Sequence, residues 1–202
     1  MNTTSNTTSN TTRNTVWEPW NAIVLAGGRA ARLDGVDKAG VEVHGRTLLA
    51  WTLDAVIDAR EVVVVGDPVL TDRPVTFTRE DPRHGGPVAA ALTGLDALHR
   101  PAAYVAVVAV DMPRLTPHTL RRLLDAAAAP GADGAALVGP DGRRQLALVL
   151  ATARLQEVRP DHEGQHGMAL RALLEPLTLT PVEAVGDEHR DIDTWSDLRD
   201  IG

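Results

Sequence analysis

The feature that most restricts the fold of this chain is an apolar run that ends directly in two glycines. Residues 23–26 read I-V-L-A, and Gly27 and Gly28 follow at once. A short apolar run that stops at glycines is typical of a buried strand that leads into a loop with unusual backbone angles. In α/β proteins, ligands bind at this end of a strand. The run therefore predicts an α/β fold with a ligand site beside Gly27 and Gly28.

The rest of the chain alternates between strand and helix patterns. Apolar residues at helical spacing predict helices at about 47–59, after Pro87, after Thr116 and around 170–174. Apolar or β-branched runs predict strands at 41–43, 62–65, 104–110, 134–139 and 146–150. The last two strands are joined by the turn sequence P-D-G, and we expect them to pair as a hairpin at one edge of the sheet. Alternating strand, helix and strand is the pattern of a mostly parallel sheet.

Length and composition favour one enzyme-sized domain. The 202 residues suffice for one substantial core and are few for two, so we expect residues 16–202 to form a single domain. Residues 1–15 repeat N-T-T-S with no apolar stretch, which predicts a disordered tail. No apolar run approaches twenty residues, so we expect no membrane span. The chain has no cysteine, which excludes disulfides and thiolate metal sites.

The charges of the chain bear on its partners. A net charge of -7, with the arginines scattered, argues against binding to nucleic acid, which depends on neutralising phosphates. A phosphorylated ligand would therefore be held locally, with a divalent cation offsetting like charge. Arginine is the usual cation, with 19 copies against the single Lys38. A lone lysine in such a chain indicates a specific role.

The segment after the first predicted strand has the composition of a phosphate site. Gly27 and Gly28 let backbone N–H groups approach a ligand, and Arg29, Arg32 and Lys38 follow closely. Neither the P-loop pattern G-x-x-x-x-G-K-[ST] nor the dinucleotide pattern G-x-G-x-x-G fits these residues. A tight turn with solvated arginines is the alternative interpretation.

Two further positions are candidates for ligand contacts. Gly86 and Pro87 begin a predicted helix, whose free N–H groups can bind an anion or serve only as an ordinary helix start. Asp111 ends the apolar run 104–110, where a carboxylate faces the ligand crevice and is costly to leave without a cation. Capping of a turn is the alternative for Asp111.

The pattern H-E-x-x-H at residues 162–166 matches that of zinc proteases, which need these residues on a stable helix. Pro160, Gly164 and Gly167 disfavour a helix there, so we predict a polar loop instead.

Near the C-terminus, Thr194 and Asp197 have the spacing of a helix cap. Asp191 and Asp193, just before the cap, remain as candidate metal ligands.

Several of these motifs together resemble the MobA-like nucleotidyltransferases, the family of the molybdenum cofactor guanylyltransferases. The family signature L-A-G-G-x-x-x-R, followed by glycine and lysine, is matched by Leu25, Ala26, Gly27, Gly28, Arg32, Gly35 and Lys38. Leu33-Asp34 replaces the usual Met-Gly. The sequence G-P-V-A-A at residues 86–90 resembles the family's G-P-L-A-G. D-M-P at 111–113 and D-I-D-T at 191–194 match further motifs, with Trp195 where proline is usual.

The resemblance implies a three-layer α/β/α sandwich with a Rossmann-like nucleotidyltransferase fold. It implies transfer of GMP from GTP to the molybdopterin-type cofactor in the cytoplasm, with release of pyrophosphate and transient contact with molybdoenzymes. Catalysis would involve Arg32, Lys38 and Asp111, while Mg²⁺ would be bound by Asp111 with Asp193, or Asp191 instead. The nucleotide would be bound by Leu25, Ala26, Gly27, Gly28, Lys38, Gly86, Pro87 and Asp111.

The sequence leaves alternatives to this function open. L-A-G-G favours GTP, because cytidylyl relatives commonly have L-A-A-G, but CMP transfer to the same cofactor is the nearest alternative. Transfer to another phosphorylated small molecule is a second one. A nucleotide-binding partner of molybdoenzymes without catalytic activity is a third.

Overall fold

A computed structural model of the protein describes residues 18–27 and 37–200. Its main sheet contains β1 (Trp20–Leu25), β4 (Val62–Val65), β5 (Thr76–Thr78), β6 (Tyr104–Ala109), β7 (Gly134–Val138), β8 (Arg144–Ala151) and β9 (Leu179–Glu183). Two short strands, β2 (Glu42–Val43) and β3 (Arg46–Thr47), form a separate hairpin. The helices are the short 3-10 helix η1 (Lys38–Gly40), α1 (Leu48–Ala55), α2 (Pro87–Asp96), α3 (Pro117–Ala127), α4 (Thr152–Glu157), α5 (Leu170–Leu174) and α6 (Trp195–Asp200).

The main sheet has the strand order β5-β4-β1-β6-β8-β7-β9. Strands β5, β4, β1 and β6 run parallel to one another, and β9 runs parallel to β7. Only β8 is antiparallel to its neighbours β6 and β7 within the described sheet. The expectation of a mostly parallel sheet is thus confirmed, and the carboxyl ends of four adjacent strands share one edge.

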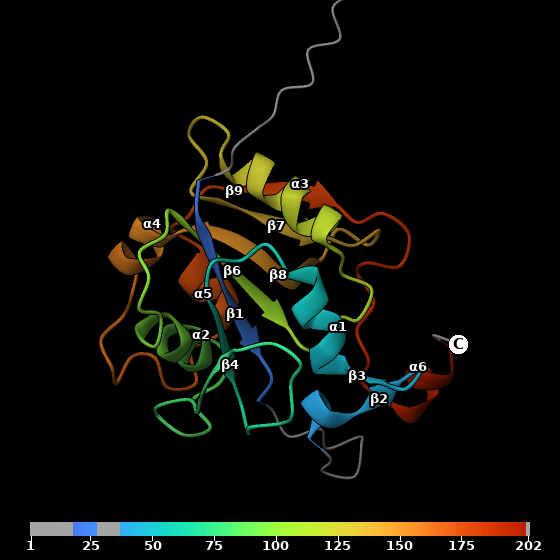
Figure 1. The fold of residues 1–202 in the computed structure, drawn as a ribbon. Coiled ribbons are helices and arrows are strands. Elements are labelled where there is room, and N and C mark those ends of the chain that lie inside the picture. The colour runs from blue at the N-terminus through green and yellow to red at the C-terminus, as the bar shows by residue number, and fades with distance from the viewer. Residues whose placement is uncertain (1–17, 28–36, 201–202) are drawn as a thin grey trace, which may run out of the picture.

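Helices cover both faces of this sheet and complete a three-layer sandwich (Figure 1). On one face, α1 and α3 pack on side chains such as Val24, Val64 and Val108. On the other face, α2 and α5 pack on side chains such as Ile23, Val63 and Val107. Neighbouring residues of each strand therefore enter different cores. This is why the central strands read as continuous apolar runs in the sequence.

The packing between α2 and the sheet depends on a glycine. A Cβ atom built on Gly94 of α2 would lie 2.4 Å from Ile23 Cγ2 and 3.0 Å from Val65 Cγ2. Real Cβ atoms do not approach other atoms so closely, so Gly94 allows α2 to lie directly on β1 and β4. This close contact fixes where the first turn of α2 meets the strand ends.

The predicted hairpin of β7 and β8 is present, but its predicted position at the edge of the sheet is wrong. The register pairs Ala135 with Val149, as expected of antiparallel neighbours. Strand β9 lies outside β7 and forms the edge, with Ala136 paired to Pro181. The sequence did not reveal β9 because proline is unfavourable in a strand, except at an edge.

In β9, the backbone nitrogen of Pro181, which carries no hydrogen, faces away from the neighbouring strand β7. Ala184 N donates to Val138 O at 2.9 Å, so in this alternating ladder Val182 and Thr180 also face β7. The backbone N and O atoms of residues 181 and 183 then face outward.

Among residues 18–27 and 37–200, no helix combines the length and the apolar character needed to cross a bilayer.

Candidate active site

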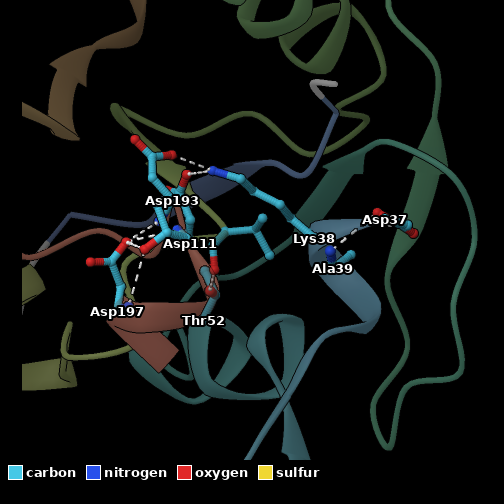
Figure 2. A network of polar contacts seen from close by, with 9 residues as sticks. Asp37, Lys38, Ala39, Thr52, Asp111, Asp193 and Asp197 are labelled. Carbon is cyan, nitrogen blue, oxygen red and sulfur yellow. Dashed lines mark hydrogen bonds and ion pairs between the residues drawn. The ribbon is translucent and has the colours of Figure 1, made fainter. Parts of the chain in front are cut away.

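The centre of the candidate site is the ammonium group of Lys38, which lies between two carboxylates (Figure 2). Lys38 Nζ donates hydrogen bonds to Asp111 Oδ2 at 2.7 Å and to Asp193 Oδ1 at 2.8 Å. The three residues come from η1, from the turn after β6 and from the segment before α6. The fold thus brings together three residues that the sequence analysis selected separately.

Local structure fixes the position of Lys38. Asp37 caps η1, since its side chain accepts a hydrogen bond from Ala39 N at 3.1 Å. Only 16% of the Lys38 side chain is exposed. Burial by itself lowers the pKa of the Lys38 ammonium, but the hydrogen bonds and charges of Asp111 and Asp193 outweigh it and raise the pKa above its ordinary value. Lys38 therefore stays positively charged in the site.

The backbone holds the two acidic segments together. Ile192 N donates to Asp111 O at 2.8 Å, and the Ile192 side chain is fully buried. Asp111 and the segment 191–193 are thus joined beside β6. The Asp193 side chain keeps 47% of its surface exposed, whereas that of Asp111 keeps 19%.

The predicted cap of the C-terminal helix is confirmed, and it also positions Asp193. Asp197 Oδ2 accepts hydrogen bonds from Thr194 N at 2.7 Å and Asp193 N at 3.0 Å, while Thr194 Oγ1 accepts from Asp197 N at 3.2 Å. The hydrogen bonds from the Thr194 side chain and from the backbone N–H groups of Asp193 and Thr194 lower the pKa of Asp197. The cap of α6 therefore fixes the backbone that presents Asp193 to Lys38.

Next to this centre lies an open pocket of about 660 Å³ at the carboxyl edge of the sheet. Such a volume suits a nucleotide-sized ligand. Strands β1 and β6 contribute its base, the first turn of α2 one side, and the segment after β5 the far end. The lining residues are Leu25, Gly27, Glu80, His84, Gly86, Pro87, Ala90, Ala109, Asp111 and Leu146.

The predicted nucleotide-binding residues have different places around this pocket. Leu25, Gly27, Gly86, Pro87 and Asp111 line it. Gly86 has a φ angle of +89°, which favours glycine, and it begins α2 with Pro87 in the first turn. Ala26 is buried and does not line the pocket.

The backbone at the glycine turn already has partners. Both Ala26 N and Gly27 N donate to Val65 O at 2.9 Å. Gly28, Arg29 and Arg32 lie outside the described residues.

Asp191, the alternative metal ligand, lies near the same centre. Burial of its carboxyl raises the pKa of Asp191, and the charges of Asp193 and Asp111 add to the rise, while that of Lys38 opposes it. Asp191 is therefore close enough to Asp193, Asp111 and Lys38 for their charges to act on it.

The H-E-x-x-H segment forms turns and no helix, as predicted. His162 Nε2 lies 3.5 Å from Asp81 Oδ2. Across the part of the chain that the structure describes, no three His, Cys, Asp or Glu residues are grouped to hold a metal. This segment instead supports the pocket, because Gly167 N donates to Gly85 O at 2.8 Å.

Four further residues line the pocket but were not among the predicted site residues: Glu80, His84, Ala109 and Leu146. Glu80 and His84 follow β5, a strand of three residues that is too short for a clear periodic pattern. Ala109 ends the apolar run of β6, two residues before Asp111. The position of Ala109 at the end of a buried strand could have identified it as a pocket residue from the sequence.

The residues present fit a divalent cation. Asp111 and Asp193 each place an oxygen atom within 2.8 Å of the same positive charge on Lys38. Hard cations such as Mg²⁺ take oxygen ligands, and Mg²⁺ is usually held by one or two carboxylates together with substrate phosphates. Two carboxylates beside an open pocket are such a set.

A mostly parallel sheet with a glycine turn, a helix N-terminus and an acid–lysine centre along one edge is the arrangement expected of a nucleotidyltransferase of the Rossmann-like fold. The comparison with known proteins agrees. Residues 22–182 match the model of the MobA-like NTP transferase domain, and the chain belongs to this family.

Individual relatives give the same picture. The chain is 37% identical over 143 residues to a molybdenum cofactor guanylyltransferase from Bradyrhizobium sp. (strain ORS 278), a match that covers 67% of each chain. Its fold is similar to that of molybdopterin-guanine dinucleotide biosynthesis protein A from Archaeoglobus fulgidus, with a TM-score of 0.68, 21% identity and coverage of 89% of this chain and 95% of that one.

The fold is also similar to that of 2-C-methyl-D-erythritol 4-phosphate cytidylyltransferase from Thermus thermophilus. The TM-score is 0.64 at 23% identity, with coverage of 88% of this chain and 94% of that one. The fold is thus shared by proteins named for different bases, so the base must be argued from the site.

Proposed function

We propose that the protein transfers GMP from GTP to the molybdopterin-bound molybdenum cofactor and releases pyrophosphate. The observation that carries this proposal is the contact of Lys38 with both Asp111 and Asp193 beside a nucleotide-sized pocket. The names of the relatives support the choice of guanine and of the acceptor.

In this reaction a terminal phosphate oxygen of the acceptor attacks the α-phosphorus of GTP, and the bond from that phosphorus to the bridging oxygen of pyrophosphate breaks. No protein nucleophile is needed, since positioning and charge stabilisation supply most of the catalysis in phosphoryl chemistry. The Lys38 ammonium offsets negative charge on the phosphates. The N-terminus of α2, which follows Gly86 and begins at Pro87, offers the bound nucleotide a favourable dipole and the N–H groups of the residues after Pro87. Arg32 is a further cation for the phosphates in this proposal.

Asp111 and Asp193 would hold Mg²⁺, with Asp191 as the alternative second ligand. When bound there, the ion would neutralise phosphate charge beside the reacting phosphorus. Burial is the main cause of the raised pKa of Asp191, and the charges of Asp193 and Asp111 add to it; a divalent cation would relieve the part that the charges contribute. Lys38 would then contact the phosphates while it remains beside Asp111 and Asp193.

The test is pyrophosphate release with molybdenum cofactor as acceptor and with GTP or CTP as donor. We expect release with GTP to exceed that with CTP, and Asp111→Asn to abolish it. Asp72→Asn, an equal change of charge at an exposed position away from the pocket, should keep full activity. Wild-type activity of Asp111→Asn in Mg²⁺ would refute the metal site.

A second measurement separates the base from the reaction. GTP should raise the melting temperature more than CTP at equal concentration, because a ligand that binds only the native state stabilises it. Equal protection by the two nucleotides would remove the case for guanine.

A further inference from the structure

The carboxyl edge of the sheet carries two acidic residues at opposite ends of one pocket. In the register of the parallel strands, Leu25 pairs with Ala109 on one side and with Val65 on the other, and Val65 pairs with Thr78. Asp111 lies two residues beyond Ala109, and Glu80 lies two residues beyond Thr78. Asp111 and Glu80 therefore follow their strands at corresponding backbone positions, and the strands that carry them are three spacings or about 14 Å apart.

The reaction centre sets the direction in which a nucleotide lies along this edge. Lys38, Asp111 and Asp193 form the end of the site that suits phosphates. Glu80 lines the same pocket at the far end, past β1 and β4. This step rests on the proposed function: if the phosphates are bound at Asp111, the base of an extended nucleotide reaches the segment that carries Glu80.

The structure holds Glu80 in a fixed position. Its Oε1 atom accepts a hydrogen bond from His84 N at 2.7 Å, and its side chain is 26% exposed. His84 has a φ angle of +59°, in the left-handed region that residues other than glycine seldom adopt. Gly85, the next residue, is joined to the 161–167 turns through its carbonyl oxygen and Gly167 N.

One oxygen of Glu80 is left for a ligand. Within the described part of the chain, no hydrogen bond is made to Oε2. The loop 79–86 therefore presents a carboxylate that is oriented before any nucleotide binds.

The chemistry of a carboxylate selects among the bases. Guanine carries two adjacent donors, N1–H and the 2-amino group, and a carboxylate only accepts hydrogen bonds. Cytosine presents an amino group beside the lone pair of N3, which a carboxylate repels. We propose that Glu80 is the residue that selects guanine, by accepting hydrogen bonds from N1–H and the 2-amino group.

Two alternatives to base selection by Glu80 must be considered: another acid could select the base, or Glu80 could have only a structural role. Asp67 also follows a strand of this edge, and it shares a neighbouring cavity with Glu80, but it is exposed, pairs with Arg79 Nε at 2.8 Å and does not line the pocket beside Asp111. Glu80 could also serve only as the partner of His84 N. Glu80→Gln separates these roles, because its amide oxygen can still accept from His84 N while the other atom becomes a donor.

The experiment measures the dissociation constants of GTP, ITP and CTP for the full chain in Mg²⁺ without acceptor. ITP differs from GTP by lacking the 2-amino group. We expect wild-type protein to bind GTP about tenfold or more tightly than ITP, since a hydrogen bond to a charged group contributes about 1.5 kcal/mol or more. In Glu80→Gln the ratio of the two constants should fall towards one, with the melting temperature of the free protein unchanged.

Control variants locate the effect. Asp67→Asn and Glu18→Gln, the latter an exposed residue before the amino end of β1, should keep the wild-type ratio. Retention of the wild-type ratio in Glu80→Gln would overturn the assignment to Glu80, and loss of the ratio in Asp67→Asn would move it to Asp67.

The wild-type measurements keep the test valid if a variant is unstable. Equal affinity of the wild type for GTP and ITP would overturn the role of Glu80 while leaving transfer of GMP intact. Absence of binding of any of the three nucleotides would refute the proposed function itself, and the assignment of Glu80 with it.

Discussion

Replacing Lys38 by arginine tests whether this lysine acts in the reaction or only holds two acids together. The Lys38 side chain is mostly buried, and its single nitrogen reaches both Asp111 and Asp193 within 2.8 Å. A guanidinium keeps the charge and can still donate to both acids, but its planar fork is larger and cannot take the place of a compact ammonium among phosphate oxygens. We expect turnover to fall at least about tenfold, equivalent to roughly 1.4 kcal/mol of transition-state stabilisation.

The stability of the protein should respond differently to the two possible substitutions. Lys38→Arg should leave the melting temperature nearly unchanged, because the ion pairs remain. Lys38→Met removes both charge-assisted hydrogen bonds and leaves two carboxylates facing each other. Because Asp193 is half exposed, we expect a modest loss of about 2 kcal/mol in the free energy of unfolding. For a domain of this size that corresponds to a fall of about 4–8 °C in melting temperature.

The assay pairs pyrophosphate release under saturating substrates with thermal unfolding of the same samples. A large loss of activity in Lys38→Arg without loss of stability is the expected result. Full activity of Lys38→Arg would refute the argument, make Lys38 a spectator and leave the phosphates to Arg29 and Arg32.

The remaining predictions concern stability. In Gly94→Ala the added Cβ meets Ile23 Cγ2 at 2.4 Å, so overpacking of about 1–3 kcal/mol should exceed the gain of about 1 kcal/mol in helix propensity and lower the urea midpoint. Gly40→Ala, whose Cβ meets nothing within 4 Å, is the control, and an equal midpoint shift in both would contradict a steric cause. Burial alone raises the pKa of Glu188, but hydrogen bonds from Thr119, Val185 N and Arg122 outweigh it and lower the pKa below its ordinary value of 4.5. A lowered folded-state pKa contributes stability above pH 4.5 that is lost as the pH falls through the folded value. The stability difference between wild type and Glu188→Gln should therefore be largest at pH 7 and shrink below pH 4.5 in urea titrations, and a difference independent of pH would show that the charge of Glu188 is not responsible.

Much of the central sheet could be predicted from the sequence because its strands are buried on both faces. Val62–Val65 and Tyr104–Ala109 enter two cores at once, so each reads as an unbroken apolar run. The edge strands lack this signal. Thr76–Thr78 is short and half exposed, and Leu179–Glu183 contains Pro181. The first helix also ends at Ala55, earlier than the periodicity to residue 59 indicated, and Ile57 is exposed.

The sequence predicted which residues belong to the candidate site, but not that they lie together in space. Lys38 stood out as the single lysine, Asp111 as an acid at the end of a buried strand, and Asp193 as an acid that a helix cap did not require. Their meeting at one point depends on the strand order, which periodicity does not contain. Glu80 could not be found in this way, because its place follows from the register of a strand that the sequence did not reveal.

The outward-facing Pro181 affects how the sheet can meet another chain. A strand that approached the free side of β9 would need a continuous row of backbone donors and acceptors to extend the ladder. Pro181 interrupts that row in the middle of β9, and the outward-facing Glu183 O already accepts a hydrogen bond from Arg122 Nη1 at 2.7 Å. At the opposite end, β5 offers only three residues. Both margins of the sheet are therefore poor templates for added strands, which protects an otherwise valine-rich sheet from intermolecular β-pairing and aggregation.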